Sequence, residues 1–592
     1  MQNSETSNVS GKTYLDLFRR YLGPQWQKAA FMALLLLVGI GLQLVVPQVL
    51  RYFIDTAQAG GATSLLIRAA LIYLGVAVIN QILGAGATYF GADVGWTATN
   101  YMRRDLAEHC LNLDMSFHTA RNAGEMIERI DGDVTALSDF FSQFSVRLIG
   151  ASLLLIGILI LLWLETPLAG LALTGFTVLV MLLLIVTRRI AVPSTVLERE
   201  ASAQHFGFIE ERLAGLEDIR ANGGGEHAMR RFILSMRSYY FDTRRAWLMR
   251  SSIWLSSFGL FMIGDVLTLA IATHLVLQNT ISIGTAYLVF QYMLMLRSPI
   301  EQITRQLQEL QKAAASIGRI GALFETSSSL SEPEGLTIAE GAQAVSFENV
   351  SFSYDDKTIL HNLNFQLKPG TVLGLLGRTG SGKTTLTRLL FRLYDPTQGT
   401  VRLNGTDVKE ALPAHLHKRV GMVTQEVQLF HASVRDNLTF FDPTISDEAI
   451  FSLLEELGLS SWLATLSDGL DTILSAGNAG LSAGEAQLLA FTRVFLKDPG
   501  LVILDEPSSR LDPATEKQLE RAIAKLLQGR TAIIIAHRLA TVDRADEIMI
   551  LEDGQILEYD RREKLAHDKG SRFYRLLQAG NMDLDERMVT GV

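Results

Sequence analysis

Long apolar stretches alternate with charged connections over the first half of the chain. The first stretch, residues 29–54, is long enough to cross a lipid bilayer as a helix that rises about 1.5 Å per residue. Five more stretches of similar character follow, at residues 65–90, 144–163, 167–186, 253–277 and 283–296. The pattern therefore predicts six membrane-spanning helices.

The connections between these stretches are of two kinds. Those near residues 56–63, 165 and 278–280 are very short, whereas two others are much longer, and only the long ones are rich in arginine. Because connections rich in Lys and Arg stay on the cytoplasmic side, we expect both long connections to face the cytoplasm. Arg19, Arg20 and Lys28 place the N-terminus there too, and an even number of spans then places the C-terminal half there as well.

Helical periodicity continues beyond the predicted membrane limits in both long connections. We expect each connection to consist of long helices broken by a short turn, near residues 116–125 in the first and 215–222 in the second. Two interpretations of these turns are open. They are either solvated loops or contact surfaces for the C-terminal domain.

The second half of the chain has the alternation of an α/β domain. Short runs with strand character, at residues 344–352, 372–376, 501–504 and 532–535, are separated by helical segments. Such alternation is typical of a largely parallel sheet with helices on its faces. The stretch before it, residues 321–341, is rich in Ser, Glu and Gly without strong periodicity and predicts a linker.

Composition narrows the class of protein. Of the 592 residues, 48% are hydrophobic and only 19% charged, which favours a membrane-embedded part. The net charge of -9 argues against nucleic acid as a partner. A single cysteine, Cys110, excludes an intrachain disulfide framework and a cysteine cluster for a metal. The polar first twelve residues have no signal-peptide core, so we expect the first span to direct insertion.

A glycine-rich stretch follows the strand-like run at 372–376. Its residues, Gly377-Arg378-Thr379-Gly380-Ser381-Gly382-Lys383-Thr384, match the P-loop pattern G-x-x-x-x-G-K-[ST] and precede a helical segment. Glycines let the backbone wrap a polyphosphate, and successive N–H groups and a helix N-terminus supply positive dipole ends. Lys383 would neutralise the β- and γ-phosphates and Thr384 would bind Mg²⁺. The sequence therefore predicts binding of a nucleoside triphosphate with Mg²⁺.

A second apolar run, residues 501–504, ends in two carboxylates. Phosphoryl transfer depends on positioning and on neutralising charge, so one acid is needed for the metal and one for the attacking water. We expect Asp505 to act through the Mg²⁺ shell and Glu506 to polarise the water. An apolar run followed by Asp-Glu is weak evidence for a nucleotide site by itself. Downstream of a P-loop it is strong evidence.

Further motifs occur in a fixed order along the same domain. They are Tyr354 in SFSYDD, Gln425 in MVTQEVQLF, LSAGEAQ at 481–487, SSRLD at 508–512 and His537 in IIAHR. With them the chain resembles an ATP-binding cassette transporter of the exporter type. The resemblance covers nearly the whole chain and implies a helical membrane domain with six spans fused to a cytoplasmic α/β P-loop NTPase domain.

The resemblance implies five parts. They are an N-terminal cytoplasmic segment with an interfacial or surface helix at 13–27 (1–28), a transmembrane domain with six spans and two long cytoplasmic loops (29–320), a linker (321–341), a nucleotide-binding domain (342–580) and a flexible tail (581–592).

The resemblance also implies roles for individual residues. Tyr354 would stack on adenine, Gln425 would contact Mg²⁺ and water, and His537 would contact the γ-phosphate. The ATP ligands would be Tyr354, Gly377, Arg378, Thr379, Gly380, Ser381, Gly382, Lys383, Thr384 and Thr385, while Ser482 and Gly484 would reach ATP held by a partner chain. Glu506, His537 and Gln425 form the predicted catalytic group, and Thr384, Gln425 and Asp505 the predicted metal group.

The segment LSAGEAQ at residues 481–487 resembles the signature sequence of the family but departs from its usual pattern, LSGGQ. Ala483 replaces the first glycine and Glu485 replaces the glutamine, whereas Ser482 and Gly484 are kept. An added methyl group hinders close backbone approach, and a carboxylate near phosphate is repulsive. We therefore expect the site completed by this signature to be impaired. A heterodimer is favoured, in which the second half-transporter chain has a regular signature and a weakened P-loop side that lacks, for example, the catalytic glutamate. A homodimer with two sites of low activity is the alternative.

The implied function is ATP-driven export of a small molecule, lipid or peptide across the cell membrane. The implied partners are the second chain, the lipid bilayer and the transported substrate, and no nucleic acid. An ATP-gated channel or regulator would share the motifs, but vesicles that contain it would not accumulate substrate against a concentration gradient. An importer is disfavoured because its membrane domain is usually a separate chain. Asp265, inside the fifth span, has either a substrate or gating role or a buried structural partner.

Overall fold

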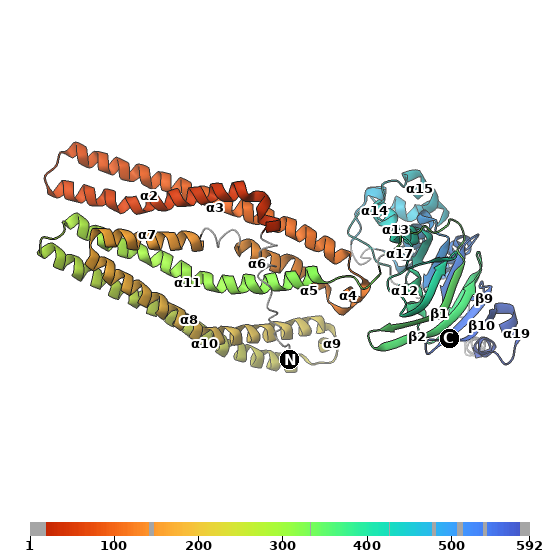
Figure 1. The fold of residues 1–592 in the computed structure, drawn as a ribbon. Helices are drawn as coiled ribbons and strands as arrows, with labels where there is room; N and C mark the ends of the chain where they lie inside the picture. Colours follow the sequence, from red (N-terminus) through yellow and green to blue (C-terminus); the bar gives the residue numbers. More distant parts are fainter. Residues whose placement is uncertain are drawn as a thin grey trace. The chain divides into compact units, whose positions relative to one another are not determined.

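The computed structural model describes residues 19–140, 147–331, 333–425, 427–475, 481–505, 513–536 and 542–579. They divide into two compact units. The helical unit consists of Met1–Asn112 and Arg121–Ser327, and the α/β unit of Leu113–Ala120 and Ser328–Val592. Figure 1 shows the elements of both units.

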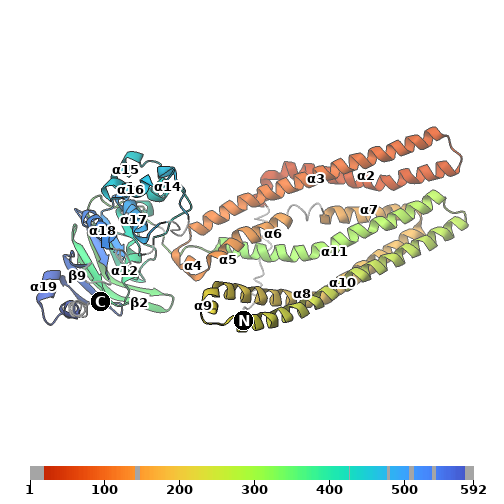
Figure 2. The ribbon, with the colours of Figure 1, turned by 180° about the vertical axis from the view of Figure 1, so that it is seen from behind.

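The helical unit consists of long helices joined by short turns. Its helices are η1 (Gly23–Gln25), α2 (Trp26–Gln58), α3 (Thr63–Leu111), α5 (Ala123–Ile127), the π-helical η2 (Glu128–Asp133), α6 (Val134–Asp139), α7 (Gly150–Glu165), α8 (Pro167–Ala214), α9 (Leu216–Ala221), α10 (Gly225–Leu277) and α11 (Ile283–Glu325). Helices α2 and α3 pair along one side, and α8 and α10 pair as far as the turn that holds α9, as both faces of the molecule show (Figures 1 and 2).

Among the described residues, five helices are long and apolar enough to cross a membrane. They are Arg19–Gln58, Thr63–Leu111, Arg147–Glu165, Pro167–Ala214 and Gly225–Leu277. The sixth predicted span, residues 283–296, is the start of α11, where Gln291, two tyrosines and the nearby Arg297 lower the mean hydropathy. The count of six therefore stays a prediction. Of the predicted helix at 13–27, residues 13–18 lie outside the described part, and the rest leads through η1 into α2.

The core of the helical unit forms along α11. Leu288, Tyr292, Leu296 and Ile300, spaced four residues apart, are buried in one cluster with residues of α7, α8 and α10. This spacing puts one stripe of the helix against its neighbours.

Polar contacts join three helix ends. Arg51 of α2 donates to Glu165 at the end of α7 over 2.6 Å. Asp55, one turn further along α2, accepts from the Ser282 hydroxyl and the Gly284 N–H, both at 2.9 Å, at the start of α11. Helix α2 is thereby fixed to α7 and α11 at the end of the unit that carries the α2–α3 and α10–α11 turns (Figure 1).

Asp265 has an ionic partner in the structure. Its carboxylate lies 3.7 Å from the guanidinium of Arg297 on α11, and Arg297 also lies over the Phe261 ring at 5.0 Å from the ring centre. A charge inside a membrane helix needs such compensation. The contact supports the structural role for Asp265, and a substrate or gating role stays a prediction.

The α/β unit contains two sheets and a helical part. Its strands are β1 (Val345–Tyr354), β2 (Lys357–Leu367), β3 (Val372–Leu376), β4 (Gln398–Leu403), β5 (Thr406–Asp407), β6 (Val420–Val423), β7 (Leu501–Asp505), β8 (Thr531–Ile535), β9 (Glu547–Glu552) and β10 (Gln555–Arg561). Its helices are α4 (Met115–Ala120), α12 (Lys383–Leu390), α13 (Pro413–Arg419), α14 (Val434–Thr439), α15 (Asp447–Glu456), α16 (Ser460–Ala464), η4 (Gly469–Asp471), α17 (Ala483–Lys497), α18 (Pro513–Leu526) and α19 (Arg562–His567).

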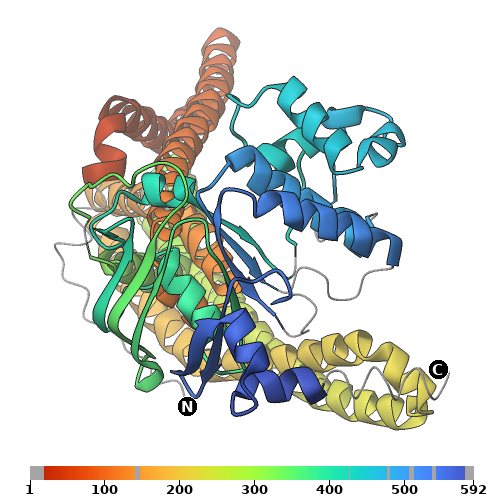
Figure 3. The same cartoon turned by 90° about the vertical axis from the view of Figure 1, so that its right-hand side faces the viewer.

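The larger sheet has the order β10-β9-β3-β8-β7-β6 and is parallel from β9 to β6. The smaller sheet, β2-β1-β4-β5, is antiparallel. In Figure 3 the cyan segment that contains α14 and α15 lies apart from the green strands. The largely parallel sheet confirms the α/β fold class predicted from the sequence, whereas the antiparallel sheet was not predicted.

The predicted linker begins later than expected. Helix α11 continues to Glu325, so residues 321–325 are helical rather than part of the linker at 321–341. Buried side chains recur at Ile317, Ile320 and Leu323, and this helical spacing extends the helix past Gly321. The predicted tail at 581–592 lies outside the described residues.

The packing around Gly264 of α10 gives a prediction for the helical unit. A Cβ atom at Gly264 would lie 2.2 Å from Met293 Cε and 2.4 Å from Phe176 Cζ, whereas one at Gly259 on the same helix would meet nothing within 4 Å. We expect Gly264→Val to destabilise the unit by about 1–3 kcal/mol through overpacking. Thermal unfolding in detergent measures the change. Gly259→Val is the matched control, and an equal loss of stability in both variants would contradict close packing at Gly264.

Candidate functional site

The candidate site lies where parallel strands end. The register pairs Leu375 of β3 with Ile535 of β8, Ile535 with Asp505 of β7, and Leu504 of β7 with Val423 of β6. The carboxyl ends of these strands therefore meet at one edge of the sheet, where ligands bind in open α/β sheets. The P-loop follows β3, Asp505 ends β7 and Gln425 comes two residues after β6, so the backbone brings three predicted site segments to one edge.

The P-loop glycines occupy positions that other residues could not. Gly377, Gly380 and Gly382 have φ values of 153°, 84° and 104°. A Cβ atom at Gly377 would lie 2.3 Å from the Leu551 carbonyl oxygen, and one at Gly382 would lie 2.5 Å from Leu360. Space beside Gly380 is open within 4 Å. The loop therefore closes tightly against the protein on one side and is accessible at Gly380.

The polar groups of the loop suit a phosphate ligand. Lys383 is the first residue of α12, is buried, and donates to the carbonyl oxygens of Gly377 and Arg378 over 2.7 and 3.1 Å. The Ser381 hydroxyl is buried and, among the described residues, makes no hydrogen bond. A buried hydroxyl without a partner is costly, and phosphate oxygens would supply one. Together with the N-terminus of α12 these groups form an anion cradle.

The remaining P-loop residues differ in how far their side chains are exposed. Arg378, Thr379 and Thr384 are exposed, while Thr385 is buried under the loop. Thr384 lies in the first turn of α12, where its hydroxyl is accessible to an ion at the phosphates. The loop therefore exposes Arg378, Thr379 and Thr384, whereas Ser381, Lys383 and Thr385 are buried.

Tyr354 ends β1 within an aromatic group. Its ring lies 4.8 Å from that of Phe352 and 5.1 Å from that of Tyr394, both edge to face, and its hydroxyl accepts from Arg388 of α12 over 3.1 Å. The ring is half-buried, so one side is held by protein and the other is accessible for stacking. The structure thus joins the predicted adenine-binding ring to the helix that follows the P-loop.

Candidate metal ligands are oxygen donors. Asp505 is half-buried at the end of β7 and Gln425 is exposed after β6. Within the described part of the chain, no group of three His, Cys, Asp or Glu side chains forms a metal site from protein ligands alone. Mg²⁺ is usually held by one or two protein oxygens together with phosphates and water, and Thr384, Gln425 and Asp505 fit that requirement.

The signature segment forms the start of α17. Ser482 is its N-cap: the Ser482 hydroxyl accepts from the Glu485 N–H over 3.2 Å, and the Glu485 carboxylate accepts from the Ser482 N–H over 2.8 Å. The same carboxylate accepts from the Ser482 hydroxyl over 2.8 Å. The hydroxyl expected to reach a γ-phosphate is therefore engaged by the residue that replaces the signature glutamine.

This capping box was missed in the sequence analysis, although its pattern Ser-x-x-Glu is present at 482–485. The two neighbouring residues behave differently. Ala483 is exposed, so its methyl group is not needed for packing. Gly484 is buried, and a Cβ atom there would lie 2.3 Å from Thr515 Cγ2 of α18. Gly484 is therefore fixed by packing within this chain.

Three predicted groups lie outside the described residues. These are Glu506, the SSRLD motif at 508–512 and His537. Asp505 and Ala536, the described residues next to Glu506 and His537, lie at the ends of β7 and β8. The roles of Glu506 and His537 stay predictions.

The two predicted turns each contain a short helix, α4 in the first and α9 in the second. Helix α4 belongs to the α/β unit, where the Thr119 hydroxyl lies 3.3 Å from the Tyr394 hydroxyl. Helix α9 belongs to the helical unit. The first turn is thus a contact surface for the C-terminal domain, and the same role for the second stays a prediction.

Comparisons with known proteins match both units. A family model described as ABC transporter matches residues 360–509, and one described as ABC transporter transmembrane region matches residues 30–300. An uncharacterised ABC transporter ATP-binding protein of Bacillus subtilis, YknV, is 29% identical over 553 residues, which are 92% of this chain and 91% of that protein. An ATP-dependent lipid A-core flippase of Alcanivorax borkumensis is 28% identical over 571 residues, 94% of this chain and 96% of the flippase.

The fold is also found in a solved structure. A bacterial Atm1-family ABC exporter with ATP bound matches with a TM-score of 0.78 at 22% identity, over 93% of this chain and 98% of that chain. At this identity the match concerns the fold. It extends over the helical and the α/β parts together.

The contact between Ser482 and Glu485 gives a prediction for the site. We expect Glu485→Gln to raise ATP hydrolysis at the site that this signature completes by roughly tenfold, about 1.4 kcal/mol, because it removes a carboxylate near phosphate and frees the Ser482 hydroxyl. Phosphate release from the purified protein measures the effect, in a Lys383→Ala background so that the site of this chain's own P-loop does not mask the change. The same variant should lose some stability of α17, since a capping box stabilises a helix start.

Glu448→Gln is the matched control, because Glu448 is exposed in the first turn of α15. It should leave the hydrolysis rate unchanged. An unchanged or lower rate in Glu485→Gln would show that the carboxylate does not limit this site.

Proposed function

This chain belongs to the ABC transporter family, and on that premise we propose that it is one half of an asymmetric two-chain exporter. As a member of the family it is a multi-pass membrane protein with a cytoplasmic nucleotide-binding domain, and it couples ATP hydrolysis to export. The observation that carries the proposed asymmetry is the contrast within the α/β unit. The P-loop forms an open anion cradle, whereas the signature serine is held by Glu485.

The proposal assigns two ATP sites to the assembled transporter. One is formed by the P-loop, Asp505, Glu506 and His537 of this chain with a regular signature from the partner, and it hydrolyses ATP. The other is formed by the partner's P-loop and the altered signature of this chain, and it turns over slowly. A carboxylate beside phosphate supports this assignment, because its repulsion opposes closure of the second site.

Each residue of the first site has a proposed role. Tyr354 stacks on adenine, the loop residues from Gly377 to Thr385 hold the phosphates, and Lys383 neutralises their charge. Thr384, Asp505 and Gln425 would hold Mg²⁺, which would neutralise charge on the transferred phosphoryl group. Glu506 orients the water and His537 contacts the γ-phosphate.

The transported substrate is proposed only by class. One relative that matches nearly the whole chain is named as a lipid A-core flippase, so a lipid falls within the proposed range. Small molecules and peptides complete that range. The polar side of α11 near Gln291 and Ser298 supports a pathway that admits water as well as apolar groups.

Asymmetry predicts unequal effects of the two P-loop lysines. We expect a tagged form of this chain to co-purify with a second chain in equal amount. In that complex Lys383→Ala should reduce ATP hydrolysis by roughly 100-fold or more, because the phosphates lose their positive ligand at the hydrolysing site. The corresponding lysine change in the partner should reduce it far less. Full activity of this chain purified alone would contradict the heterodimer.

Removal of the proposed water-orienting group gives a second prediction. We expect Glu506→Gln to lower hydrolysis by roughly 100-fold or more while ATP binding is retained, because the amide accepts a proton poorly but leaves the phosphate cradle intact. Phosphate release and equilibrium ATP binding measure the two effects. Glu520→Gln, an exposed change on α18, is the control. Normal hydrolysis in Glu506→Gln would refute the role.

A further inference from the structure

The chain passes between its two units at three places, two of which follow long helices. Helix α3 ends at Leu111 just before the first crossing, and α11 ends at Glu325 just before the third. Within the helical unit these two helix ends are in contact. The His109 ring nitrogen Nε2 lies 2.9 Å from the Leu323 carbonyl oxygen, and the His109 ring lies 5.6 Å from the Phe324 ring.

Inside the α/β unit the same two segments are joined again, through Asp114. One carboxylate oxygen, Oδ1, accepts from the Phe117 N–H over 3.1 Å and so caps α4. The other, Oδ2, accepts from the Ser328 hydroxyl over 3.2 Å and from the Ser329 N–H. Asp114 is only 8% exposed. One buried carboxylate therefore binds the start of the first cytoplasmic turn and the start of the linker.

This carboxylate is charged under all ordinary conditions. Burial alone would raise the pKa of Asp114, but the N–H groups of Ser329 and Phe117 and the Ser328 hydroxyl outweigh it and lower the pKa to about 2. Because the pKa in the folded protein is below the ordinary value of 3.8, the contact is fully formed above that value and is lost only as the pH falls through about 2. Charge-assisted hydrogen bonds of this kind are stronger than neutral ones.

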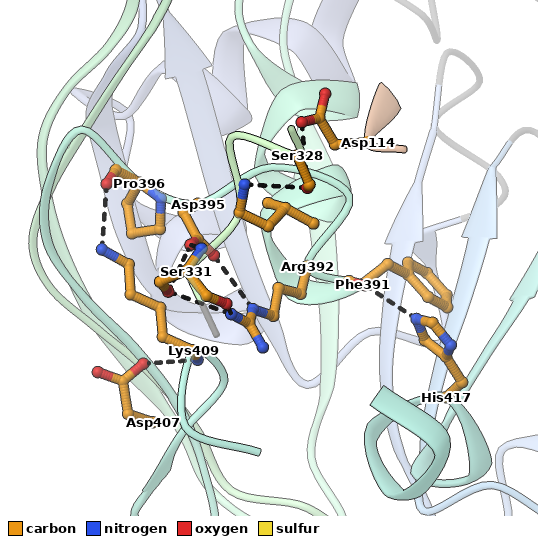
Figure 4. Close-up of polar contacts among 11 residues, drawn as sticks. Asp114, Ser328, Ser331, Phe391, Arg392, Asp395, Pro396, Asp407, Lys409 and His417 are labelled. Carbon is orange, nitrogen blue, oxygen red and sulfur yellow. Dashed lines mark hydrogen bonds and ion pairs between the residues drawn. The ribbon is translucent and has the colours of Figure 1, made fainter. Parts of the chain in front are cut away.

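Further along the linker, Ser331 lies beside Arg392 and Asp395 of the α/β unit (Figure 4). Ser331 donates to Asp395 through its N–H over 3.1 Å and its hydroxyl over 3.0 Å. Arg392, whose side chain is 4% exposed, donates to the Ser331 carbonyl oxygen over 2.6 Å and to Asp395 over 3.2 Å. Further along, the Leu336 N–H donates to the Glu410 carbonyl oxygen over 3.0 Å. The linker is fixed to the unit rather than suspended between units.

The other end of α4 leads toward the nucleotide site. Thr119 contacts the hydroxyl of Tyr394, and the Tyr394 ring packs edge to face against Tyr354, the proposed adenine-binding residue. A movement at the adenine position thus has a packed path to α4. Asp114 then connects α4 to the linker.

We propose that Asp114 is a positioning residue that joins the first cytoplasmic turn and the linker into one rigid joint, through which ATP binding moves α3 and α11 together. The inference rests on the proposed function and describes how the α/β unit of this chain acts on the helical unit. Without the joint, the turn and the linker would move independently, and a movement at the nucleotide site would reach only one of the two helices.

Hydrogen–deuterium exchange on the full chain, purified with its partner, tests the joint. The probes are ATP with vanadate, compared with no nucleotide. In the wild-type protein we expect protection of the P-loop and an altered exchange rate in the turns after α2 and α10, near residues 59–62 and 278–282. In Asp114→Asn the P-loop protection should persist, whereas the response of the two turns should fall roughly fivefold or more.

Asn is chosen because its amide oxygen still caps a helix, so α4 is kept, while the amide NH2 that replaces Oδ2 cannot accept from the Ser328 hydroxyl or the Ser329 N–H. The matched control is Asp442→Asn, since the Asp442 carboxylate accepts only from Thr444 within its own turn among the described contacts. If ATP with vanadate changed the exchange rate at residues 59–62 and 278–282 as much in Asp114→Asn as in the wild type, the inference would be overturned.

A reversible variant separates the joint from a general loss of stability. The chain has one cysteine, Cys110, so Asp114→Cys and Ser328→Cys can be combined with Cys110→Ala. We expect the reduced form to lose the turn response and the disulfide-bonded form to regain it. Failure of the disulfide to restore the response would contradict the joint. A wild-type protein whose turns do not respond to ATP would instead refute the proposed function, and the inference with it.

Discussion

Backbone hydrogen bonding between parallel strands is the constraint on which the rest of the structure depends. The ladders of β3, β8, β7 and β6 set the four strand ends at one edge. Three predicted site segments, the P-loop, Gln425 and Asp505, lie within two residues of such an end, so the backbone alone brings them together. The close fit of Gly377 and Gly382 against the protein then restricts the shape of the loop.

Helix α17 shows a conflict between local stability and phosphate recognition. A glutamate three residues after a serine N-cap stabilises the start of a helix, and Glu485 does so through both the backbone and the hydroxyl of Ser482. The same helix start would face a nucleotide held by a partner chain. A carboxylate there adds negative charge where phosphate must approach, so what stabilises this chain alone weakens the shared site.

The contacts of Asp114 join the first cytoplasmic turn to the linker within the α/β unit. Two segments that are far apart in the sequence, at 113–120 and 328–331, share one carboxylate and continue into the long helices α3 and α11. Since Arg392 and Asp395 hold the next part of the linker, the connection is supported over several residues. In the helical unit, the His109 contact with Leu323 continues the same pairing.

The sequence alone determined the chemistry that is local along the chain. The sequence shows the P-loop, the carboxylate at the end of β7 and the apolar stretches, because each needs particular residues at adjacent or periodic positions. The parallel sheet follows from the alternation of strand-like and helical segments. The linker boundary was set too early because the stretch from residue 321 is rich in Ser, Glu and Gly, whereas buried Ile320 and Leu323 extend α11 to Glu325. Only the tertiary structure decided that Asp114 meets Ser328, that Arg297 compensates Asp265 and that Thr515 requires Gly484, because these pairs are distant in sequence and no local pattern relates them.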